Sequence, residues 1–320
     1  MRAIRIEEHG GPEVMRWTEL PDPVPGPGEA LVRLGVAGVN YMDVGARALG
    51  GAGWAAPVIL GAEGMGRVTA LGEGVTDLAV GDRVAWFYHP GSYAELLAVR
   101  ADSLVKVPDE VPDEIAGGVL MQGLTANHLT TETYPVGPGD TALVHAAAGG
   151  VGQLLTQLVK ARGGRVIGLL SREEKAPVAQ EAGADHVLVH SGGGFEERVR
   201  ELTGGRGADV AYDGGGTDTF LSSQASLRPH GVHAYYGPFM GVPTLRPTDL
   251  PNSILLTYPV VHHHVATREA LLRRAGEVFD LVRHGRLTLR ITGRYPLAEA
   301  ARAHADIESR RTTGKLVLLP

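Results

Sequence analysis

The sequence contains no cysteine among its 320 residues. Disulfide bonds, thiolate metal sites and a cysteine nucleophile are therefore excluded. The chain also lacks an excess of positive charge, since its formal net charge is −6. A protein that binds duplex nucleic acid needs a basic face to displace counterions, so this balance argues against a nucleic-acid partner.

Long apolar runs are absent as well. The N-terminal stretch MRAIRIEEHGGPEV has no long apolar segment, and no run in the chain reaches membrane-spanning length. We therefore expect a cytoplasmic protein without a membrane partner. The 45 glycines and 20 prolines imply many turns, which favours a barrel or an α/β architecture over a helical bundle. A length of 320 residues allows one large domain or two ordinary ones.

The first 120 residues are rich in strand and turn signals. Residues 29–39 (EALVRLGVAGV) have strand composition, and the proline-rich stretch before them excludes a helix or a central strand. Residues 66–87 predict a strand, a turn and a second strand, and residues 91–108 predict two further short strands. Short strands separated by Gly and Pro turns indicate a closed or partly closed β domain.

From about Gln122 the pattern changes to alternating strands and helices, and the strands are apolar throughout. Such alternation is typical of a buried parallel sheet. The expected strands are 141–146, 165–170, 185–189, 208–213, 231–236 and 252–258, and the expected helices are 151–162, 172–183, 195–205 and 217–228.

After Val265 the pattern predicts two helices, 267–285 and 296–310, and a closing strand at 314–320. This tail has no strand–helix alternation of its own, so we assign it to the first domain. The expected domains are therefore 1–121 with 266–320, and an inserted α/β domain at 122–265.

The stretch VHAAAGGVGQ joins the first expected strand of the α/β domain to its first helix. In the dinucleotide fingerprint G-x-G-x-x-G, Ala147 takes the first position and Gly149 and Gly152 take the next two. The free N–H groups at the start of such a helix bind anions, so we expect a pyrophosphate to lie against residues 148–152, namely Ala148, Gly149, Gly150, Val151 and Gly152. A tight turn without a ligand is the alternative. A P-loop is disfavoured because no Gly-Lys-Ser/Thr follows.

The end of the next strand distinguishes two cofactors. NAD-binding proteins place an Asp or Glu about 20 residues downstream of the glycine turn to bind the ribose 2′-hydroxyl. Here Ser171, Arg172 and Lys175 come first, and a cationic group there suits the 2′-phosphate of NADPH. Glu173 and Glu174 keep open the alternative of a solvated helix start with mixed charges.

At this point the chain resembles the medium-chain dehydrogenase/reductase superfamily, specifically its zinc-free NADPH:quinone oxidoreductases of the zeta-crystallin-like branch. The resemblance covers nearly the whole chain and implies a GroES-like, partly open β-barrel domain with an inserted Rossmann domain and a cofactor cleft between them. The motifs that carry it are HGGPEV (9–14), GVNYMDV (38–44), GAEGMGRV (61–68), GDRVA (81–85), GSYAE (91–95), GLTA (123–126), HAAAGGVG (145–152), AYDGGG (211–216) and TGKLVL (313–318).

The same motifs argue against zinc. The alcohol dehydrogenase branch holds its catalytic metal on cysteines and on a histidine in a Gly-His-Glu segment, where this chain has Gly61-Ala62-Glu63. Without those ligands neither the catalytic nor the structural zinc forms. We expect Glu63 to support the domain junction by hydrogen bonding. The run His262–His264 is a poor single metal site, because consecutive residues point in different directions, and surface or interface histidines are expected instead.

The resemblance also implies site residues. Asn40 is expected at the nicotinamide and the substrate, with an Asn-stabilised turn as the alternative, and Tyr41 offers a phenol that can donate a proton to a developing enolate or phenolate. Thr125 and the pair Tyr236-Gly237 are expected near the nicotinamide. Lys315 either reaches towards the cofactor cleft or is a surface lysine.

Two segments depart from the family pattern. His190 stands where relatives commonly have a tyrosine near the adenosine, and an imidazole there can stack or bind a phosphate. Residues 46–57 (ARALGGAGWAAP) replace a tyrosine-containing loop on the substrate side, which leaves the preferred acceptor open.

The sequence therefore predicts an NADPH-dependent quinone oxidoreductase that transfers hydride to a quinone or a related electron-poor acceptor without a metal. The alternatives are an NADPH-dependent enone or 2-enoyl double-bond reductase and a non-catalytic NADPH-binding protein. A homodimer joined through the Rossmann sheet edges is expected, since segments 231–243 and 252–265 lie at the end of that sheet in chain order.

Overall fold

The structure is a computed structural model that describes residues 1–51, 53–190, 192–237 and 241–320. These residues form two compact units, the first made of 1–124 with 265–320 and the second of 125–264. Part of the segment expected at the dimer edge, Pro238–Met240, lies outside the described residues, as do Ala52 of the substrate-side loop and Ser191. Within the described residues, no helix is both long and apolar enough to cross a membrane.

The first unit contains two sheets. A seven-stranded sheet has the order β15-β16-β3-β5-β6-β8, with β7 paired to β3, and a three-stranded sheet has the order β2-β1-β4. The strands are β1 (Arg2–Ile6), β2 (Arg16–Glu19), β3 (Glu29–Val39), β4 (Val58–Ile59), β5 (Glu63–Leu71), β6 (Arg83–Phe87), β7 (Leu96–Arg100), β8 (Val105–Lys106), β15 (Ile291–Pro296) and β16 (Lys315–Leu319). The α-helices are α1 (Tyr41–Leu49), the N-terminal part of α2 (Asp113–His128), α8 (Arg268–Arg283) and α9 (Ala300–Glu308).

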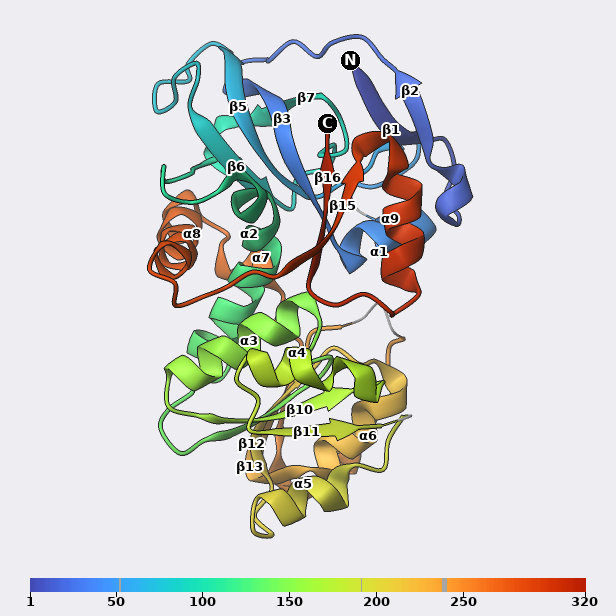
Figure 1. The fold of residues 1–320 in the computed structure, drawn as a ribbon, viewed down its shortest axis with the longest axis vertical. Helices are drawn as coiled ribbons and strands as arrows, with labels where there is room; N and C mark the ends of the chain where they lie inside the picture. The colour runs from blue at the N-terminus through green and yellow to red at the C-terminus, as the bar shows by residue number, and fades with distance from the viewer. Residues whose placement is uncertain (52, 191, 238–240) are drawn as a thin grey trace. The chain divides into compact units, whose positions relative to one another are not determined.

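The long strand β3 organises this unit, because it pairs with β16, β5 and β7. Its carboxyl end runs directly into α1, so Asn40 lies at the junction between strand and helix. Figure 1 shows α1 and α9 packed beside each other near the carboxyl end of β3, and contacts between the two helices confirm that they touch. The start of β5 and the start of β16 are brought to the same place, since Gly38 pairs with Glu63 and Val39 pairs with Leu316.

The second unit is a six-stranded parallel sheet in the order β11-β10-β9-β12-β13-β14. The strands are β9 (Thr141–Val144), β10 (Arg165–Leu170), β11 (His186–Val189), β12 (Ala208–Asp213), β13 (Leu227–Tyr235) and β14 (Leu255–Thr257). The helices are α3 (Gly150–Ala161), α4 (Ala176–Glu181), α5 (Glu196–Leu202), α6 (Thr217–Ala225) and the short α7 (Val261–His264). Figure 1 shows α3 and α4 on one face of the sheet and α5 and α6 on the other.

The strand order reverses between β9 and β12, where the chain leaves the sheet in opposite directions. Ligands of doubly wound sheets bind outside the carboxyl ends of the strands at this switch point. The two loops that leave the sheet there are 145–149 after β9 and 214–216 after β12. A buried apolar cluster under α5, which includes Leu143, Ile167 and Phe195, fixes the strands behind this point.

Several elements have no counterpart among those predicted from the sequence. No helix was expected at α1 or α2, and no strand at β15. The glycines and β-branched residues around α1 obscure the start of the helix, where the spacing of a capping box places Asp43 Oδ2 2.8 Å from the Asn40 amide that donates to it. Helix α2 carries its apolar residues nearly all round and lacks an amphipathic stripe. Pro177, a poor interior residue, lies in the first turn of α4, where its missing N–H costs nothing.

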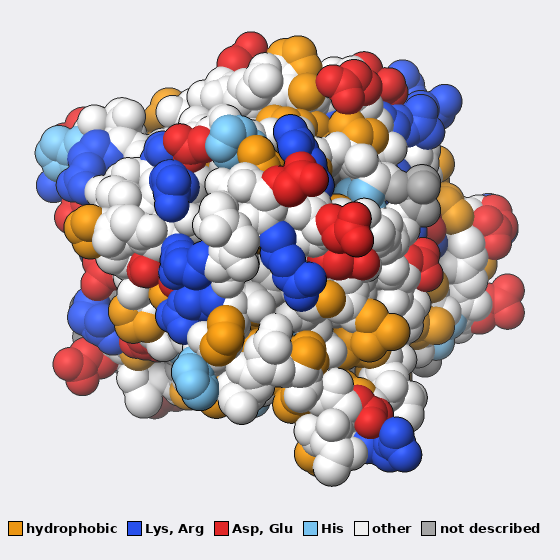
Figure 2. Space-filling view, turned by 90° about the horizontal axis from the view of Figure 1, so that it is seen from below, with side chains coloured by type: hydrophobic (Ala, Val, Ile, Leu, Met, Phe, Trp, Pro, Cys, Tyr) orange, Lys and Arg blue, Asp and Glu red, His pale blue; other side chains and the backbone are white. Residues whose placement is uncertain are grey.

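The exposed surface mixes side chains of all kinds. Figure 2 shows one face of the molecule, on which acidic, basic and apolar side chains are interspersed among the described residues. Such a surface agrees with the small net charge of −6 for 320 residues.

Candidate active site and cofactor-binding residues

The glycine turn of the second unit has the geometry of an anion site. The chain leaves β9 through Ala146, whose φ of 47° is left-handed, and α3 begins at Gly150 with Gly149 as its N-cap. The first intrahelical bond runs from the Gln153 amide to the Gly149 carbonyl at 3.0 Å. The N–H groups of Gly150, Val151 and Gly152 therefore have no acceptor within the helix and point out of its first turn.

The backbone of this turn is crowded enough to require glycine. A Cβ on Gly152 would lie 2.2 Å from the Ala146 carbonyl oxygen, and one on Gly149 would lie 3.0 Å from the same atom. The Ala147 side chain faces the next strand, since a Cβ on Gly168 would lie 2.8 Å from the Ala147 Cβ. An alanine in the first fingerprint position thus fits because Gly168 leaves room for it.

The cationic segment follows β10, the neighbour of β9. Arg172 caps the short helix at 173–175 and its side chain is 48% exposed, with an ion pair of 3.5 Å to Glu174. Ser171 is exposed and Lys175 is half-buried. At 3.5 Å and at this exposure the ion pair is weak, so the Arg172 guanidinium is available to an incoming phosphate.

A buried network joins the two loops of the switch point. The Ser223 hydroxyl lies 2.9 Å from His145 Nε2, and His145 Nδ1 lies 3.2 Å from Asp213 Oδ1. His233 Nε2 lies 3.0 Å from Asp213 Oδ2, and the Gly215 amide donates to Asp213 Oδ1 at 2.8 Å. Ser223, His145 and Asp213 are linked side chain to side chain as in the Ser-His-Asp triad of hydrolases. All three are buried, so the network holds the loops in place and offers no nucleophile to a substrate.

The charge in this network lies on Asp213. Burial lowers the pKa of His145 to about 4, so its ring is neutral at neutral pH. Burial alone would raise the pKa of Asp213, but His145 and the hydrogen bond from His233 outweigh it and hold the pKa of Asp213 at about 2. Asp213 is therefore the fixed anion that the His145 ring and the Gly215 amide face.

The remaining residues expected at the cofactor in this unit lie around the same edge of the sheet. Tyr236 follows β13, and its ring covers Gly214, where a Cβ would lie 3.2 Å from the ring. Gly237 approaches the Gly214 backbone so closely that its Cβ would lie 2.5 Å from the Gly214 Cα. His190 follows β11, makes a hydrogen bond of 2.5 Å with the Gly192 carbonyl and packs edge-on to Phe195.

In the first unit the residues expected at the nicotinamide form a buried ion cluster. Lys315 Nζ lies 2.6 Å from Glu63 Oε2 and 2.7 Å from Asn40 Oδ1, and Asn40 Nδ2 donates to Glu63 Oε2 at 3.0 Å. Lys315 and Glu63 are fully buried and Asn40 is 5% exposed. The alternative of a surface Lys315 is therefore wrong. The pair fixes the orientation of the Asn40 amide, because an ammonium only donates and a carboxylate only accepts.

Glu63 acts inside the first unit. Its second oxygen accepts the Met121 amide at 2.7 Å, so the carboxylate ties β5, β16, α2 and Asn40 together. Tyr41, the first residue of α1, is 37% exposed and its hydroxyl donates to the Ile307 carbonyl at 2.9 Å. Burial raises the pKa of the Tyr41 phenol, so the phenol stays protonated at neutral pH. Thr125 lies half-buried in α2.

The donor set does not fit zinc. Ala62, which stands at the histidine position, has no donor atom, and the neighbouring Glu63 carboxylate is already bound by the Lys315 ammonium. Among the described residues no group of three or more His, Asp or Glu side chains is arranged to hold a metal ion.

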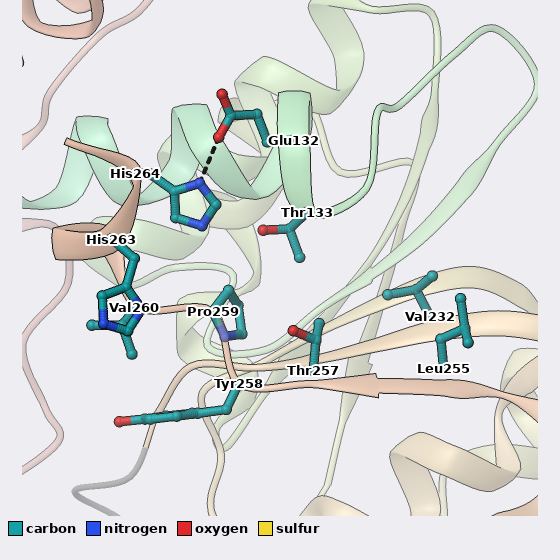
Figure 3. A pocket seen from close by; sticks show the side chains of 10 residues that line it. All are labelled: Glu132, Thr133, Val232, Leu255, Thr257, Tyr258, Pro259, Val260, His263 and His264. Carbon is teal, nitrogen blue, oxygen red and sulfur yellow. Dashed lines mark hydrogen bonds and ion pairs between the residues drawn. The ribbon is translucent and has the colours of Figure 1, made fainter. Parts of the chain in front are cut away.

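The histidine run forms part of a cavity in the second unit. His262–His264 make up most of α7, His264 Nδ1 lies 2.5 Å from Glu132 Oε2, and the His264 ring stacks on His128 at 4.1 Å. Figure 3 shows His264 and Glu132 joined at one end of a cavity of about 380 Å³ whose other end reaches Leu255 of β14.

Several members of these clusters were not singled out from the sequence as site residues. His145 and Asp213 lie within the family motifs 145–152 and 211–216, but the motifs predict no role for them, and the sequence predicts none for Asp43, Tyr93 and His304. The signal that points to Asp43 is the Asn-x-x-Asp spacing of a capping box ahead of a helix. His304 carries no local signal, because its partner Tyr93 is 211 residues away.

Comparisons with known proteins identify relatives of this chain by sequence and by fold. The family described as zinc-binding dehydrogenase matches residues 150–271, and the alcohol dehydrogenase GroES-like domain matches residues 26–109. A quinone oxidoreductase of Pseudomonas aeruginosa is 39% identical, over 100% of this chain and 99% of its own length. A 2-haloacrylate reductase of a Burkholderia species is 37% identical, over 99% and 98%. The crystal structure of Escherichia coli quinone oxidoreductase complexed with NADPH has a TM-score of 0.94 and 33% identity, and the match covers 100% of both chains.

Proposed function

The chain belongs to the medium-chain dehydrogenase/reductase superfamily, in its quinone oxidoreductase branch, and from this membership we propose that it is an NADPH-dependent quinone oxidoreductase. The observation that carries the proposal is the glycine turn at the switch point of the parallel sheet, with the cationic segment of Arg172 one strand away. The full-length likeness to quinone oxidoreductases supplies the acceptor class.

The second unit fits the cofactor. The open N–H groups of residues 150–152 suit the pyrophosphate, and the crowded backbone at Gly152 leaves no room for a side chain in that position. Ser171, Arg172 and Lys175 suit the 2′-phosphate that distinguishes NADPH from NADH. His190, Tyr236 and Gly237 complete the set in this unit. In the first unit Asn40 and Lys315, together with Thr125 of α2, are proposed as contacts on the nicotinamide side.

Bound NADPH supplies a hydride, and the acceptor is reduced by it. The protein orients the reactants and offers hydrogen-bond donors to the oxygen that gains charge. The Lys315–Glu63 pair holds the Asn40 amide in one orientation, so that its contact with substrate and cofactor is fixed before they bind. We propose Asn40 and Tyr41 as catalytic residues. Tyr41 acts as a proton or hydrogen-bond donor only when its hydroxyl leaves the Ile307 carbonyl.

The same chemistry suits a conjugated double bond, and the 2-haloacrylate reductase relative favours an enone or 2-enoyl acid reductase as the second candidate.

The experiment that separates the candidates measures NADPH oxidation after exhaustive chelation, with a panel of quinones and a matched panel of enones and 2-haloacrylates. A kcat/KM at least tenfold higher for quinones supports the proposal, and the reverse ratio supports the second candidate. Tight NADPH binding without turnover of either panel identifies a non-catalytic NADPH-binding protein. Loss of turnover that added Zn²⁺ restores contradicts the metal-free site.

A homodimer, a cytoplasmic location and the domain assignment belong to the same proposal. The strand β14 forms one end of the parallel sheet, and Leu255 on it is 64% exposed. An apolar edge strand with open backbone groups invites pairing with a second copy across a two-fold axis. Residues 1–121 with 266–320 are proposed as the GroES-like domain and residues 122–265 as the NADPH-binding domain.

A further inference from the structure

The carboxyl group of Asp43 is fully buried beside the proposed catalytic residue Asn40. One oxygen, Oδ2, accepts the Asn40 amide at 2.8 Å and the Tyr93 hydroxyl at 3.1 Å. The other oxygen, Oδ1, is buried and has no hydrogen-bond partner among the described residues. A carboxylate with one oxygen left bare in the interior is costly, whereas a protonated carboxyl carries no charge there.

The donors around Asp43 form a chain with a fixed direction. Arg47 Nη1 lies 3.1 Å from His304 Nδ1, and because a guanidinium only donates, Nδ1 accepts. Burial lowers the pKa of His304 to about 3, so the neutral ring carries its one proton on Nε2. This N–H donates to the Tyr93 oxygen at 3.1 Å, and the Tyr93 hydroxyl donates to Asp43 Oδ2. This chain of hydrogen bonds therefore ends at Asp43 Oδ2, and Oδ1 receives no hydrogen bond from the described residues.

The cations of the cluster already have partners. Lys315 is bound by Glu63 at 2.6 Å, and Arg47 is bound by Glu308 at 2.8 Å. A neutral Asp43 makes the whole group electrically balanced, and an ionised Asp43 adds one uncompensated negative charge. Burial accordingly raises the pKa of Asp43 to about 7, against the opposing effects of the Asn40 amide, Lys315 and Tyr93.

We propose that Asp43 is a positioning residue, whose protonated carboxyl keeps the Lys315–Glu63 pair and through it the Asn40 amide in the active arrangement. Ionised Asp43 attracts the Lys315 ammonium, and this ammonium is also the partner of Glu63 and the donor to Asn40 Oδ1. Activity therefore declines as the pH rises through neutrality. The kinetic part of this inference rests on the proposed function, and the state of the carboxyl group does not.

The protonation state is tested directly by infrared difference spectroscopy between pH 6 and pH 9 on the whole protein. The expected result is a carboxylic-acid C=O band at pH 6 that disappears at pH 9. The band is absent in Asp43→Asn and present in the control Asp82→Asn, since Asp82 is a surface carboxylate paired with Lys106. A pH 6 spectrum without this band, or a band that Asp43→Asn retains, overturns the proposal.

The positioning role is tested by kcat/KM profiles from pH 6 to pH 9 with NADPH and the best quinone. The ratio of kcat/KM at pH 9 to that at pH 6 is expected to rise at least fivefold in Asp43→Asn relative to the natural protein and Asp82→Asn. Tyr93→Phe removes a hydrogen bond that favours the ionised carboxyl, so its alkaline decline moves to higher pH. Identical profiles for the natural protein and Asp43→Asn overturn the role. Absence of turnover with every acceptor refutes the proposed function and leaves the infrared result to decide the protonation state.

Discussion

Lys315 Nζ lies 2.6 Å from Glu63 Oε2, and both side chains are fully buried. A buried ion pair contributes little net stability relative to a well-packed apolar pair, but removal of one partner leaves a bare charge in the interior. Because either charge alone would be costly, the two side chains stay together and form a rigid support for Asn40, which contacts both of them.

We expect Lys315→Met to lower the free energy of unfolding by roughly 3–5 kcal/mol, because it leaves Glu63 buried without its cation. The double variant Lys315→Met, Glu63→Gln should recover part of this loss. The control Lys106→Met breaks an exposed ion pair with Asp82 and should cost about 1 kcal/mol or less. Urea unfolding curves measure all three. If Lys315→Met and Lys106→Met lower the free energy of unfolding equally, the buried Lys315–Glu63 pair does not support the structure around Asn40.

The second prediction concerns the glycine turn. Gly152→Ala places a Cβ 2.2 Å from the Ala146 carbonyl, so the first turn of α3 must shift and its N–H groups lose their alignment. We expect at least a tenfold rise in the NADPH dissociation constant, roughly 1.4 kcal/mol or more. The control is Gly276→Ala in α8, where no described atom crowds the new Cβ, and it should raise stability by about 0.5–1 kcal/mol. Unchanged NADPH affinity in Gly152→Ala contradicts the assignment of the turn.

The glycine turn and the ion cluster differ in how far the sequence reveals them. The turn is local: an apolar strand, glycines at 149, 150 and 152 and an amphipathic helix stand within 21 residues of one another, and the strand β10 begins where expected. The parallel sheet is predicted for the same reason, since β9, β10 and β12 are mainly apolar and almost entirely buried. Such local patterns predict an element directly, because the spacing of the apolar residues decides whether a segment buries one face as a helix or as a strand.

The ion cluster has no such pattern. Asn40 meets Lys315 across 275 residues and Tyr93 meets His304 across 211, so only the pairing of β3 with β16 and the packing of α9 bring them together. The sequence left Lys315 open between a cofactor contact and a surface lysine, because a charged residue at the start of a strand is usually solvated. Helix α1 was missed because its signal is the Asn40–Asp43 capping box rather than helix propensity.

Cofactor selectivity gives the third prediction. We expect NADPH to bind at least tenfold more tightly than NADH, roughly 1.4 kcal/mol or more, because Arg172 and Lys175 meet the 2′-phosphate. The double variant Arg172→Ala, Lys175→Ala should reduce the difference between the two dissociation constants, because it weakens the binding of NADPH and leaves that of NADH unchanged. Arg198→Ala, which removes an exposed arginine of α5 paired with Glu201, is the control and should leave both constants unchanged. Fluorescence titration with the two cofactors decides, and equal constants in the natural protein contradict the assignment.

Acid stability gives the fourth prediction. The pKa values of His145 and His304 lie at about 4 and about 3, below the ordinary value of about 6.5, so the unfolded chain binds up to two more protons at these residues than the folded protein between pH 6 and pH 4. Stability from these histidines is present above pH 6.5 and is lost as the pH falls. Asp43 opposes them, because its raised pKa gives the folded state one extra proton over the same range.

The net slope in this window is therefore positive, and each proton contributes about 1.4 kcal/mol per pH unit. We expect His304→Gln to flatten the dependence of unfolding free energy on pH and Asp43→Asn to steepen it. Urea unfolding at half-unit intervals from pH 4 to pH 7 measures both. If the two variants change the slope in the same direction, the assigned protonation states are wrong.

The last prediction concerns the edge of the parallel sheet. At neutral pH and micromolar concentration, sedimentation equilibrium should give a dimer, because β14 leaves an apolar edge that a second copy can pair. Leu255→Lys places a charge on that edge and should shift the protein towards monomer, whereas Leu221→Lys on the exposed face of α6 should not.

The histidine run lies close to this edge, since His263 and His264 line the same cavity as Leu255. Burial lowers the pKa of His264, so charge appears there only below about 6.5, and dissociation should increase below that pH. A monomer at neutral pH refutes the dimer, and a dimer of constant strength down to pH 5 refutes only the part played by the histidines.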